Sequence, residues 1–448
     1  MRLRAYRFEP LVLLLVALAA LVAVNVSNPE DGTRYELTRH LVLRHSLEVE
    51  PQLFDRAVYG GRTYSDKAPG MSFLAVPAYQ VERTLGVARA PKDWEREGDL
   101  SLWGIHVATS GLLFLLATLL VGRAAETLVP RTGAATAATF GTATIAAPLA
   151  PTLFEHDAAG CLALAGLLCA WRCRRRALLA LAGLLLGIGV LFAYEVAVAA
   201  VVVALYVAVR ERRRVAWLLL GAVPPAVALG AYNWSAFASP FHLSYRYVAN
   251  RFALSQHHGF FGIGVPTLTG LRDALVFDRG LLVWSPVLVA AAVGLVVMWR
   301  RGYRGESLVA AVVVVAFVVG DAAYFLPYGG NSPGPRFAAP ALPLLLLGLP
   351  FALARFPRTT LALAAVSAVL TTAQSLTWAL RRENDRWYPG SGYSDLGKTV
   401  WVWLGVENRL VGAGLALLCA VAAIAVGAWR LLGPERARAA VRMQPWAP

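Results

Sequence analysis

The sequence has few charged residues for its length, and few lysines and cysteines. Only 15% of its 448 residues are charged, whereas 58% are hydrophobic, and the mean hydropathy is +0.56. Soluble domains carry about 25% charged residues and lack apolar runs of membrane length. Such runs recur here from end to end, and a membrane-spanning helix needs about 20 apolar residues. The composition therefore predicts an all-α protein, a polytopic bundle of transmembrane helices.

The four cysteines form neither a disulfide framework nor a metal-binding pattern. Internal repeats of 20–50 residues are also absent from the sequence. The net charge of +15 comes mainly from arginines in short clusters between the apolar runs, where topology signals are found. Because no basic face with interleaved aromatic residues is visible, we expect no nucleic-acid partner.

Arginine placement predicts the topology. Arg2, Arg4 and Arg7 hold the start of an uncleaved first span in the cytoplasm. The segment 71–87 is short for a span, and if it crossed, several later arginine clusters would lie outside. If it is juxtamembrane, every cluster is cytoplasmic. We therefore predict about 12 spans with both termini inside. They are roughly 10–26, 101–122, 132–153, 157–171, 177–193, 196–209, 216–235, 281–299, 307–327, 337–354, 360–380 and 409–432.

This topology gives one transmembrane domain over residues 1–432 and a short cytoplasmic tail over 433–448. The first outer loop, 28–100, contains the predicted juxtamembrane helices. The other outer segments are 154–157, 194–195, 236–280, 328–337 and 381–408. Because the cytoplasmic connections are short and basic, we expect the chemistry at the outer face of the plasma membrane.

Asp31 follows the first span and precedes a capping box, Thr33-Arg34-Tyr35-Glu36, which predicts a short surface helix from Thr33. A carboxylate there can take a proton from a hydroxyl, and Glu30 beside it would raise its pKa by like-charge repulsion. The alternative is a turn, because Asn-Pro-Glu-Asp-Gly is rich in turn residues. Spacing alone favours the turn.

Two cations mark candidate phosphate sites. Lys67 is one of three lysines, and it either neutralises a phosphate or serves as an interfacial lysine paired with Asp66. Arg336 ends a Gly/Pro-rich outer segment, and this combination suits a phosphate or pyrophosphate.

The tetrapeptide Phe154-Glu155-His156-Asp157 places three ionisable groups between apolar runs. Charges in such positions tend to mark function, and the alternative is a hydrated loop. His257 and His258 are adjacent, face apart and have no third ligand at a suitable spacing, so no metal site is predicted.

The chain resembles a family of membrane enzymes. The residues that carry the resemblance are Asp31, Arg34 and Tyr35; Tyr64, Lys67, Pro69 and Gly70; Pro77 and Tyr79; Tyr232, Asn233, Ser239 and Pro240; Arg279, Gly280, Ser285 and Pro286; and Gly334, Pro335, Arg336 and Pro340. Together they resemble the membrane glycosyltransferases of the C-type fold, and among these the protein O-mannosyltransferases and the aminoarabinose–lipid A transferases. The resemblance covers most of the chain in layout, although each motif is short.

The resemblance implies a polyprenyl-phosphate-linked sugar donor and an envelope glycan, lipid or protein acceptor. It implies Asp31 as the base with Glu30 beside it, and Lys67 near the donor phosphate. Asp157 matches an acidic residue of the second outer loop. Glu195 stands where the aminoarabinose transferases have a lysine, which inverts a charge near the donor head group. The predicted substrate-binding residues are Arg34, Tyr35, Lys67, His156, Asp157, Glu195 and Arg336.

The leading hypothesis is therefore a glycosyltransferase without a cofactor. Asp31 and Asp157 could hold a divalent metal, but none is indicated, since the leaving group carries one phosphate. One alternative is a transporter or flippase of lipid-linked sugars, which would place polar residues near the bilayer midplane. Another is a non-catalytic member of the same fold, which the departure at Glu195 keeps open.

Overall fold

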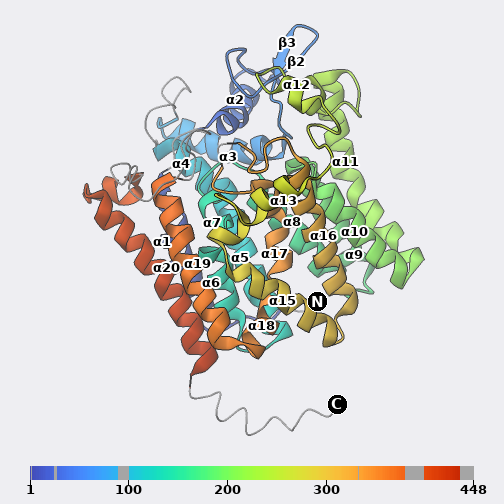
Figure 1. Cartoon of the computed structure of the whole chain (residues 1–448). Helices are drawn as coiled ribbons and strands as arrows, with labels where there is room; N and C mark the ends of the chain where they lie inside the picture. The colour runs from blue at the N-terminus through green and yellow to red at the C-terminus, as the bar shows by residue number, and fades with distance from the viewer. Residues whose placement is uncertain (2, 25–27, 89–99, 331, 379–397, 434–448) are drawn as a thin grey trace.

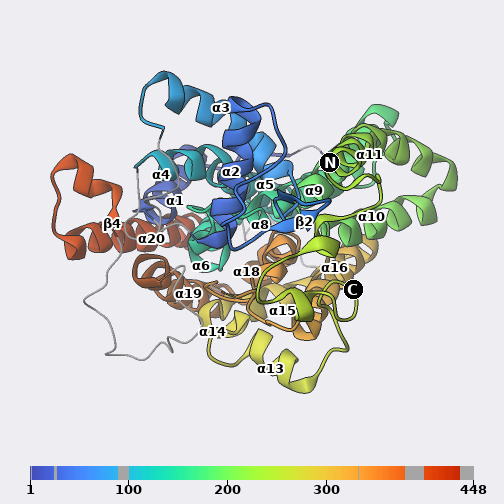
Figure 2. The same cartoon turned by 90° about the horizontal axis from the view of Figure 1, so that it is seen from above.

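The computed structural model describes residues 1, 3–24, 28–88, 100–330, 332–378 and 398–433. The predicted tail and most of the predicted loop 381–408 therefore lie outside the described residues, as does part of the loop 28–100. The described chain is a bundle of helices with two small antiparallel sheets (Figures 1 and 2). The predicted all-α class is confirmed in this sense.

The elements follow the chain from one polar loop to the next. The N-terminal part contains α1 (Glu9–Ala20), β1 (Ala23–Val24), α2 (Pro29–Leu43), β2 (Ala57–Tyr59), β3 (Arg62–Tyr64) and α3 (Gly70–Thr84). The central part contains α4 (Leu100–His106), η2 (Val107–Gly111), α5 (Leu112–Leu128), α6 (Gly133–Ala143), α7 (Ala146–Leu149), α8 (His156–Ala170), α9 (Arg176–Phe192), α10 (Val196–Arg210), η3 (Arg212–Arg214) and α11 (Val215–Phe237). Strand β2 pairs with β3.

A long loop with short helices then leads to the C-terminal part. That loop contains η4 (Ser244–Tyr247), α12 (Ala253–Gln256) and α13 (Leu268–Leu275). The C-terminal part contains α14 (Leu281–Trp284), α15 (Val287–Arg300), α16 (Arg304–Ala323), η5 (Arg336–Ala341), α17 (Leu342–Leu345), α18 (Leu349–Arg355), α19 (Pro357–Trp378), β4 (Lys398–Thr399), η7 (Val400–Leu404) and α20 (Arg409–Leu432). Strand β4 pairs with β1, so it joins the last described loop to the end of the first helix.

Each predicted span contains helix, but not all spans are continuous. Within the described residues, five helices are long and apolar enough to cross a membrane, and a pair bent by 57° makes a sixth. Five further apolar helices are shorter. The protein therefore has several membrane-capable helices, and the number of about 12 spans stays a prediction.

The breaks occur where proline interrupts the helical hydrogen bonds. The predicted span 281–299 divides at Ser285-Pro286 into α14 and α15. The predicted span 337–354 divides into η5, α17 and α18, where Pro340, Pro343 and Pro350 stand.

Helix α2 begins earlier than the sequence predicts and is not a surface helix. Asn28 caps it by accepting hydrogen bonds from the backbone N–H groups of Glu30 and Asp31, and Pro29 occupies the first helical position. The predicted start at Thr33 is therefore wrong. Ten of the fifteen residues of α2 are buried, because α3 and the segment that precedes α8 pack against it. Figures 1 and 2 show α2 and α3 at one end of the bundle, with α3 lying across the long helices.

The opposite end of the bundle gathers arginines from separate connections. Glu306 at the start of α16 accepts from Arg172 at 2.8 Å and from Arg210 at 2.9 Å, and Tyr206 donates its hydroxyl to the same oxygen at 2.7 Å. Glu306 therefore joins the α8–α9, α10–α11 and α15–α16 connections. We call this the arginine end, and the end that carries α2 and α3 the α2 end.

Candidate active site

A cavity of about 920 Å³ lies at the α2 end. Its charged lining residues are Glu30, Asp55, Asp66, Lys67, Glu155, Glu195, Arg251, Asp321 and Arg336. Its apolar wall comes from membrane-capable or apolar helices, with Val190 of α9, Val198 of α10, Leu229 of α11 and Phe317 of α16. A single cavity therefore joins a charged region, drawn largely from loops and helix ends, to the apolar interior of the bundle.

The centre of the charged region is an ion-pair network on α2. Glu30 pairs with Arg34, one turn further along the helix, at 2.7 Å, and also with Arg336. Arg34 is fully buried and pairs in turn with Glu155. Burial by itself would raise the pKa of Glu30, but the Arg336 and Arg34 guanidiniums hold that pKa well below its usual range. Glu30 is therefore a fixed anion that orients two cations.

Glu155 differs from Glu30 in its electrostatics. It lies just before α8 and lines the cavity. Burial raises its pKa to about 8, although Arg34 opposes this shift. A carboxyl group with such a pKa exchanges a proton near neutral pH, as a general acid or base must.

Lys67 lies in the loop between β3 and α3, where it lines the cavity together with Asp55 and Asp66. Its Nζ is 3.4 Å from a carboxylate oxygen of each of these residues. Burial alone would lower the pKa of Lys67, but the two carboxylates raise it above its ordinary value. Lys67 is therefore held as a cation, and burial raises the pKa of Asp66 to about 7.

Arg336 begins η5 and faces the cavity. Its guanidinium lies 4.6 Å from the centre of the Phe154 ring. This aromatic contact supports the guanidinium from one side, while Glu30 orients it. The structure thus brings together four of the residues predicted from the sequence: Glu30, Lys67, Glu195 and Arg336.

Asp31 does not line the cavity. Its carboxylate is fully buried, and Oδ1 accepts from the Leu153 backbone N–H at 2.9 Å, while Oδ2 accepts from Asn28 Nδ2 at 2.5 Å. Burial raises the pKa of Asp31 to about 7, and the hydrogen bond from Leu153 opposes this shift. Asp31 ties the start of α2 to the segment before α8, and its predicted role as the base stays a prediction.

The remaining predicted residues lie outside the cavity lining. Tyr35 packs edge-to-face against Tyr79 with ring centres 5.5 Å apart. His156 is buried between the rings of Phe154 and Phe337, and Asp157 is buried beside it in α8. Arg34 lies behind the cavity lining, where it pairs with the lining residues Glu30 and Glu155. Three of the predicted substrate-binding residues, Lys67, Glu195 and Arg336, therefore line the cavity, and the other four lie behind it.

The site list drawn from the sequence omits several lining residues. Glu155, Asp55 and Asp66 stand in polar stretches of the sequence that also contain predicted site residues. Their closeness to those residues in the chain could have identified them. Asp321 is a buried acid near the end of α16, and its position in an apolar run was a signal. The aromatic lining residues Tyr245 and Tyr324 carry no such signal, because aromatic residues are common in membrane proteins.

Two groups of side chains among the described residues have the composition and closeness to hold a metal ion. One group, Glu155, His156 and Glu195, lies at the cavity. The other, Glu36, His40 and Glu50, lies on the second half of α2 and the loop that follows it. Asp31 and Asp157, the pair considered from the sequence, are in neither group.

Comparison with solved structures identifies the fold. No protein-family model and no curated protein matches the chain. ArnT from Cupriavidus metallidurans in the apo state aligns with a TM-score of 0.56 and 16% identity, over 98% of this chain and 80% of that protein. A second structure of that enzyme, bound to undecaprenyl phosphate, aligns with a TM-score of 0.55 and 16% identity, over 98% and 81%.

The oligosaccharyltransferase of Archaeoglobus fulgidus, in complex with zinc and sulfate, aligns with a TM-score of 0.53 and 14% identity. The alignment covers 84% of this chain and 54% of that protein. Both enzymes have the C-type fold of membrane glycosyltransferases. The chain therefore has this fold, as its sequence motifs predict.

Proposed function

We propose that the protein is a membrane glycosyltransferase that moves a sugar from a polyprenyl-phosphate donor to an acceptor hydroxyl. The observation that carries the proposal is the composition of the cavity. Two cations, Lys67 and Arg336, line it together with the carboxylates that pair with them, and apolar side chains of α9, α10, α11 and α16 form another part of the lining. Neither a soluble sugar nucleotide nor a purely apolar lipid requires both surfaces. A phosphate with an isoprenoid tail matches both.

The donor phosphate is the leaving group in this reaction, so cations must stabilise its developing charge. Lys67 supplies a point charge, and Arg336 supplies a planar guanidinium suited to two phosphate oxygens. The apolar wall from α9, α10, α11 and α16 would hold the isoprenoid chain. The binding of undecaprenyl phosphate by ArnT, which shares the fold, supports this assignment.

Glu155 is the proposed base on geometric grounds. It lines the cavity beside Arg34, and its raised pKa of about 8 allows it to take the acceptor proton near neutral pH. Asp31, the base implied by the sequence resemblance, has both oxygens on internal donors and would need Asn28 to move. Glu195 also lines the cavity, and among the described residues its Oε1 has no hydrogen-bond partner. We propose that this oxygen accepts hydrogen bonds from hydroxyl groups of the donor sugar.

The site is proposed to face the outer side of the plasma membrane. Glu306 brings several arginine-rich connections together at the arginine end, which the positive-inside rule assigns to the cytoplasm. The cavity at the α2 end then opens outside, and the topology of about 12 spans is retained as part of this proposal.

The location of the charges favours an enzyme over a flippase. Glu30 begins α2, Glu155 precedes α8 and Glu195 joins α9 to α10, so these carboxylates stand at helix ends. A transporter that moved a charged head group would be expected to place them near the middle of the bundle.

The proposal is tested by expressing variants in a strain that lacks the gene and comparing surface glycans and glycolipids by mass spectrometry. Glu155→Gln is expected to abolish the sugar modification while the protein accumulates with wild-type thermal stability. Gln keeps an oxygen for Arg34, and base catalysis is worth about 10²–10⁴ in rate. Identical glycans in the deletion, wild-type and variant strains would argue against the proposed function.

The variant Asp31→Asn separates the two candidate bases. Its new N–H group would face the Asn28 amide, whose oxygen is fixed by the α2 cap, so we expect a loss of stability of about 1–3 kcal/mol. Residual activity in the folded fraction is expected. Full stability with complete loss of activity would instead assign the base to Asp31.

A further inference from the structure

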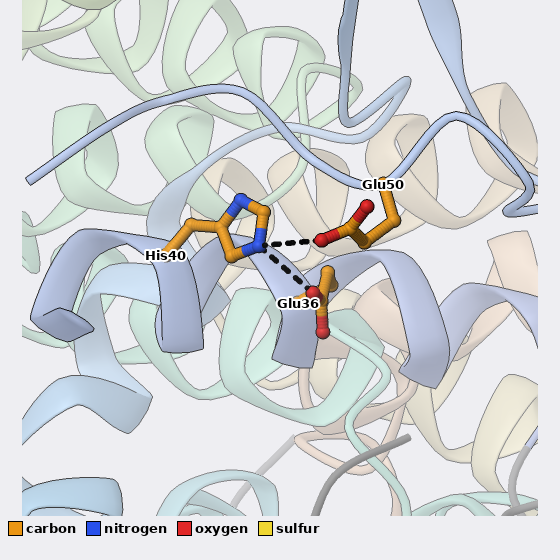
Figure 3. Close-up of side chains that lie close together, drawn as sticks. All are labelled: Glu36, His40 and Glu50. Carbon is orange, nitrogen blue, oxygen red and sulfur yellow. Dashed lines mark ion pairs between the residues drawn. The ribbon is translucent and has the colours of Figure 1, made fainter. Parts of the chain in front are cut away.

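A second cluster of ionisable side chains lies on α2 outside the cavity. Glu36 and His40 stand four residues apart, on the same face of the helix, and Glu50 reaches them from the following loop (Figure 3). His40 Nε2 is 2.9 Å from Glu36 Oε1 and 3.4 Å from Glu50 Oε1. Glu36 and His40 are buried, and none of the three residues lines the cavity.

The orientation of His40 is fixed from behind. Its Nδ1 lies 2.6 Å from the Glu48 backbone carbonyl oxygen. Since a carbonyl can only accept a hydrogen bond, Nδ1 carries a proton, and in the neutral ring the lone pair of Nε2 then points between two carboxylates. A backbone carbonyl that orients a histidine in this way is the usual outer support of a metal ligand.

Glu36 Oε1 accepts a hydrogen bond from Arg39 at 2.8 Å, but two other polar atoms of the cluster have no such bond within the described part of the chain. Among the described residues, His40 Nε2 and Glu36 Oε2 are buried without a hydrogen-bond partner. Two ligands held about 2.1 Å from a tetrahedral zinc ion lie roughly 3.4 Å apart, which is close to the separations observed here.

Two arginines approach the cluster from the side of the solvent. Arg39 contacts Glu36 Oε1 at 2.8 Å, and Arg44 contacts Glu50 Oε1 at 3.1 Å. The Arg44 side chain is 56% exposed and that of Arg39 is 23% exposed. Each arginine engages one carboxylate oxygen of the cluster, so Glu36 Oε2 stays available.

We propose that Glu36, His40 and Glu50 bind one Zn²⁺ ion, with water as the fourth ligand. One imidazole and two carboxylates neutralise the ion, and this nitrogen–oxygen ligand set suits zinc. The loop that contributes Glu50 also pairs with β3, since Val49 donates to the Thr63 carbonyl at 2.9 Å. The ion therefore fastens the helix that carries Glu30 and Arg34 to the strand that leads to Lys67.

The experiment uses the full-length protein in detergent. The protein is stripped with a chelator, exposed to ZnCl₂ and desalted, and its zinc content is measured by mass spectrometry. We expect His40→Gln and Glu50→Gln each to bind about one equivalent less zinc than the wild type. His45→Gln, the same substitution at an exposed histidine five residues further on, is the matched control and should bind as the wild type does.

Thermal unfolding gives a second measurement that does not depend on activity. Zinc should raise the melting temperature of the stripped wild-type protein and of His45→Gln, but not that of His40→Gln. Because the Glu50 side chain is partly exposed, Glu50→Gln should fold and elute as a monodisperse species in size-exclusion chromatography. This variant therefore keeps the test valid if His40→Gln misfolds. Equal zinc in the wild type, His40→Gln and Glu50→Gln would overturn the proposal. The three side chains would then be a structural cluster that holds α2 to the following loop.

Discussion

At the scale of single residues, Glu30 and Asp31 are neighbours in the chain but have opposite surroundings. Glu30 faces the cavity between two guanidiniums, which hold its pKa below the usual range against the effect of burial. Asp31 turns inward to Leu153 and Asn28, and burial raises its pKa to about 7. Because successive helical positions point about 100° apart, one residue of register decides which carboxylate meets a ligand.

Lys67 and Arg336 are expected to bind the donor phosphate. Lys67→Ala and Arg336→Ala should each weaken binding of undecaprenyl phosphate roughly 10- to 100-fold, the value of a charge-assisted contact. Lys67→Arg should retain part of the affinity, since the charge remains while the geometry differs. Binding is measured by native mass spectrometry of the purified protein.

The control for these variants is Arg62→Ala. Arg62 lies in the adjoining strand β3, its side chain is 67% exposed, and it pairs with Glu48 at 3.3 Å. Wild-type affinity is expected there. Unchanged affinity in both Lys67→Ala and Arg336→Ala would return these two residues to a purely structural role.

The pKa of Glu155 predicts a dependence on pH. A base must be deprotonated, so the transfer rate should rise with pH and level off above about 8.

The raised pKa of Glu155 has the opposite effect on stability, which should fall as the pH rises. A carboxyl group whose pKa is raised on folding stabilises the fold below its unfolded pKa, near 4.5, and this contribution is lost as the pH rises through about 8.

The melting temperature should accordingly fall between pH 5 and pH 9, and less steeply in Glu155→Gln than in the wild type. Asp31 and Asp66, with raised pKa values of about 7, keep part of the slope in the variant. A transfer rate that is independent of pH between 6 and 9 would contradict the assignment of the base.

The sequence indicates which charged residues belong to the site better than it indicates where their side chains point. Glu30, Lys67, Glu195 and Arg336 stand out because charge is rare in an apolar chain, and all four line the cavity. The burial of Asp31 depends on the Asn28 cap and on a backbone N–H more than 120 residues away. No local pattern encodes that contact, so the sequence could not choose between the two carboxylates.

At the scale of elements, α9 and α11 approach so closely that glycine is required between them. A Cβ atom on Gly183 would lie 1.8 Å from the Leu218 carbonyl oxygen, and one on Gly221 would lie 1.8 Å from the Ala180 carbonyl oxygen. Small residues permit such contact between membrane helices. Both helices also contribute to the apolar wall of the cavity.

Gly183→Leu is therefore expected to separate α9 from α11 and to destabilise the protein by about 1–3 kcal/mol or more, as overpacking does. The melting temperature in detergent should fall, and binding of the lipid phosphate should weaken because the apolar wall shifts. Gly414→Leu in α20 is the control, since a Cβ atom there meets no other atom within 4 Å. Equal stability of the two variants would refute the close approach.

Hydropathy predicts where helices lie but not how they break. The apolar run at 132–153 divides into α6 and α7 at Thr144 and Ile145, where Pro148 cannot donate to the Thr144 carbonyl four residues earlier. The threonines of α6 satisfy their hydroxyls on carbonyls four residues earlier, as Thr136, Thr139 and Thr142 do. Because these hydroxyls are satisfied within the helix, the threonines do not interrupt the apolar run. The hydropathy of the run therefore does not show where α6 ends and α7 begins.

At the scale of the whole molecule, charge is distributed between two ends. The arginine connections converge on Glu306 at one end, while the ion-pair network of Glu30, Arg34 and Arg336 lies at the other. The separation follows from the alternation of helices, because the α8–α9 and α10–α11 connections lie at the arginine end and the α9–α10 connection lies at the α2 end. The proposed topology depends on α3 lying across the bundle rather than through it.

Cysteine labelling tests that topology. In a variant whose four native cysteines are replaced by alanine, Arg62→Cys and Thr84→Cys bracket α3 at exposed positions. Gly98, the position suggested by the sequence, lies outside the described residues, so Thr84 at the end of α3 replaces it. Both cysteines should react with an impermeant maleimide on intact cells, since a helix that does not cross leaves both of its ends on one side.

The native Cys173, restored alone, supplies the opposite expectation. It lies among the arginines between α8 and α9, is partly exposed, and should react only after the cells are permeabilised. Labelling of Arg62→Cys and Thr84→Cys from opposite sides would mean that α3 crosses the membrane. Every later connection would then change sides, Arg172 and Arg210 would lie outside, and the cavity that holds Lys67 could no longer share its side with Arg336. Joint labelling from outside, with Cys173 protected, is the pattern that a single extracytoplasmic site requires.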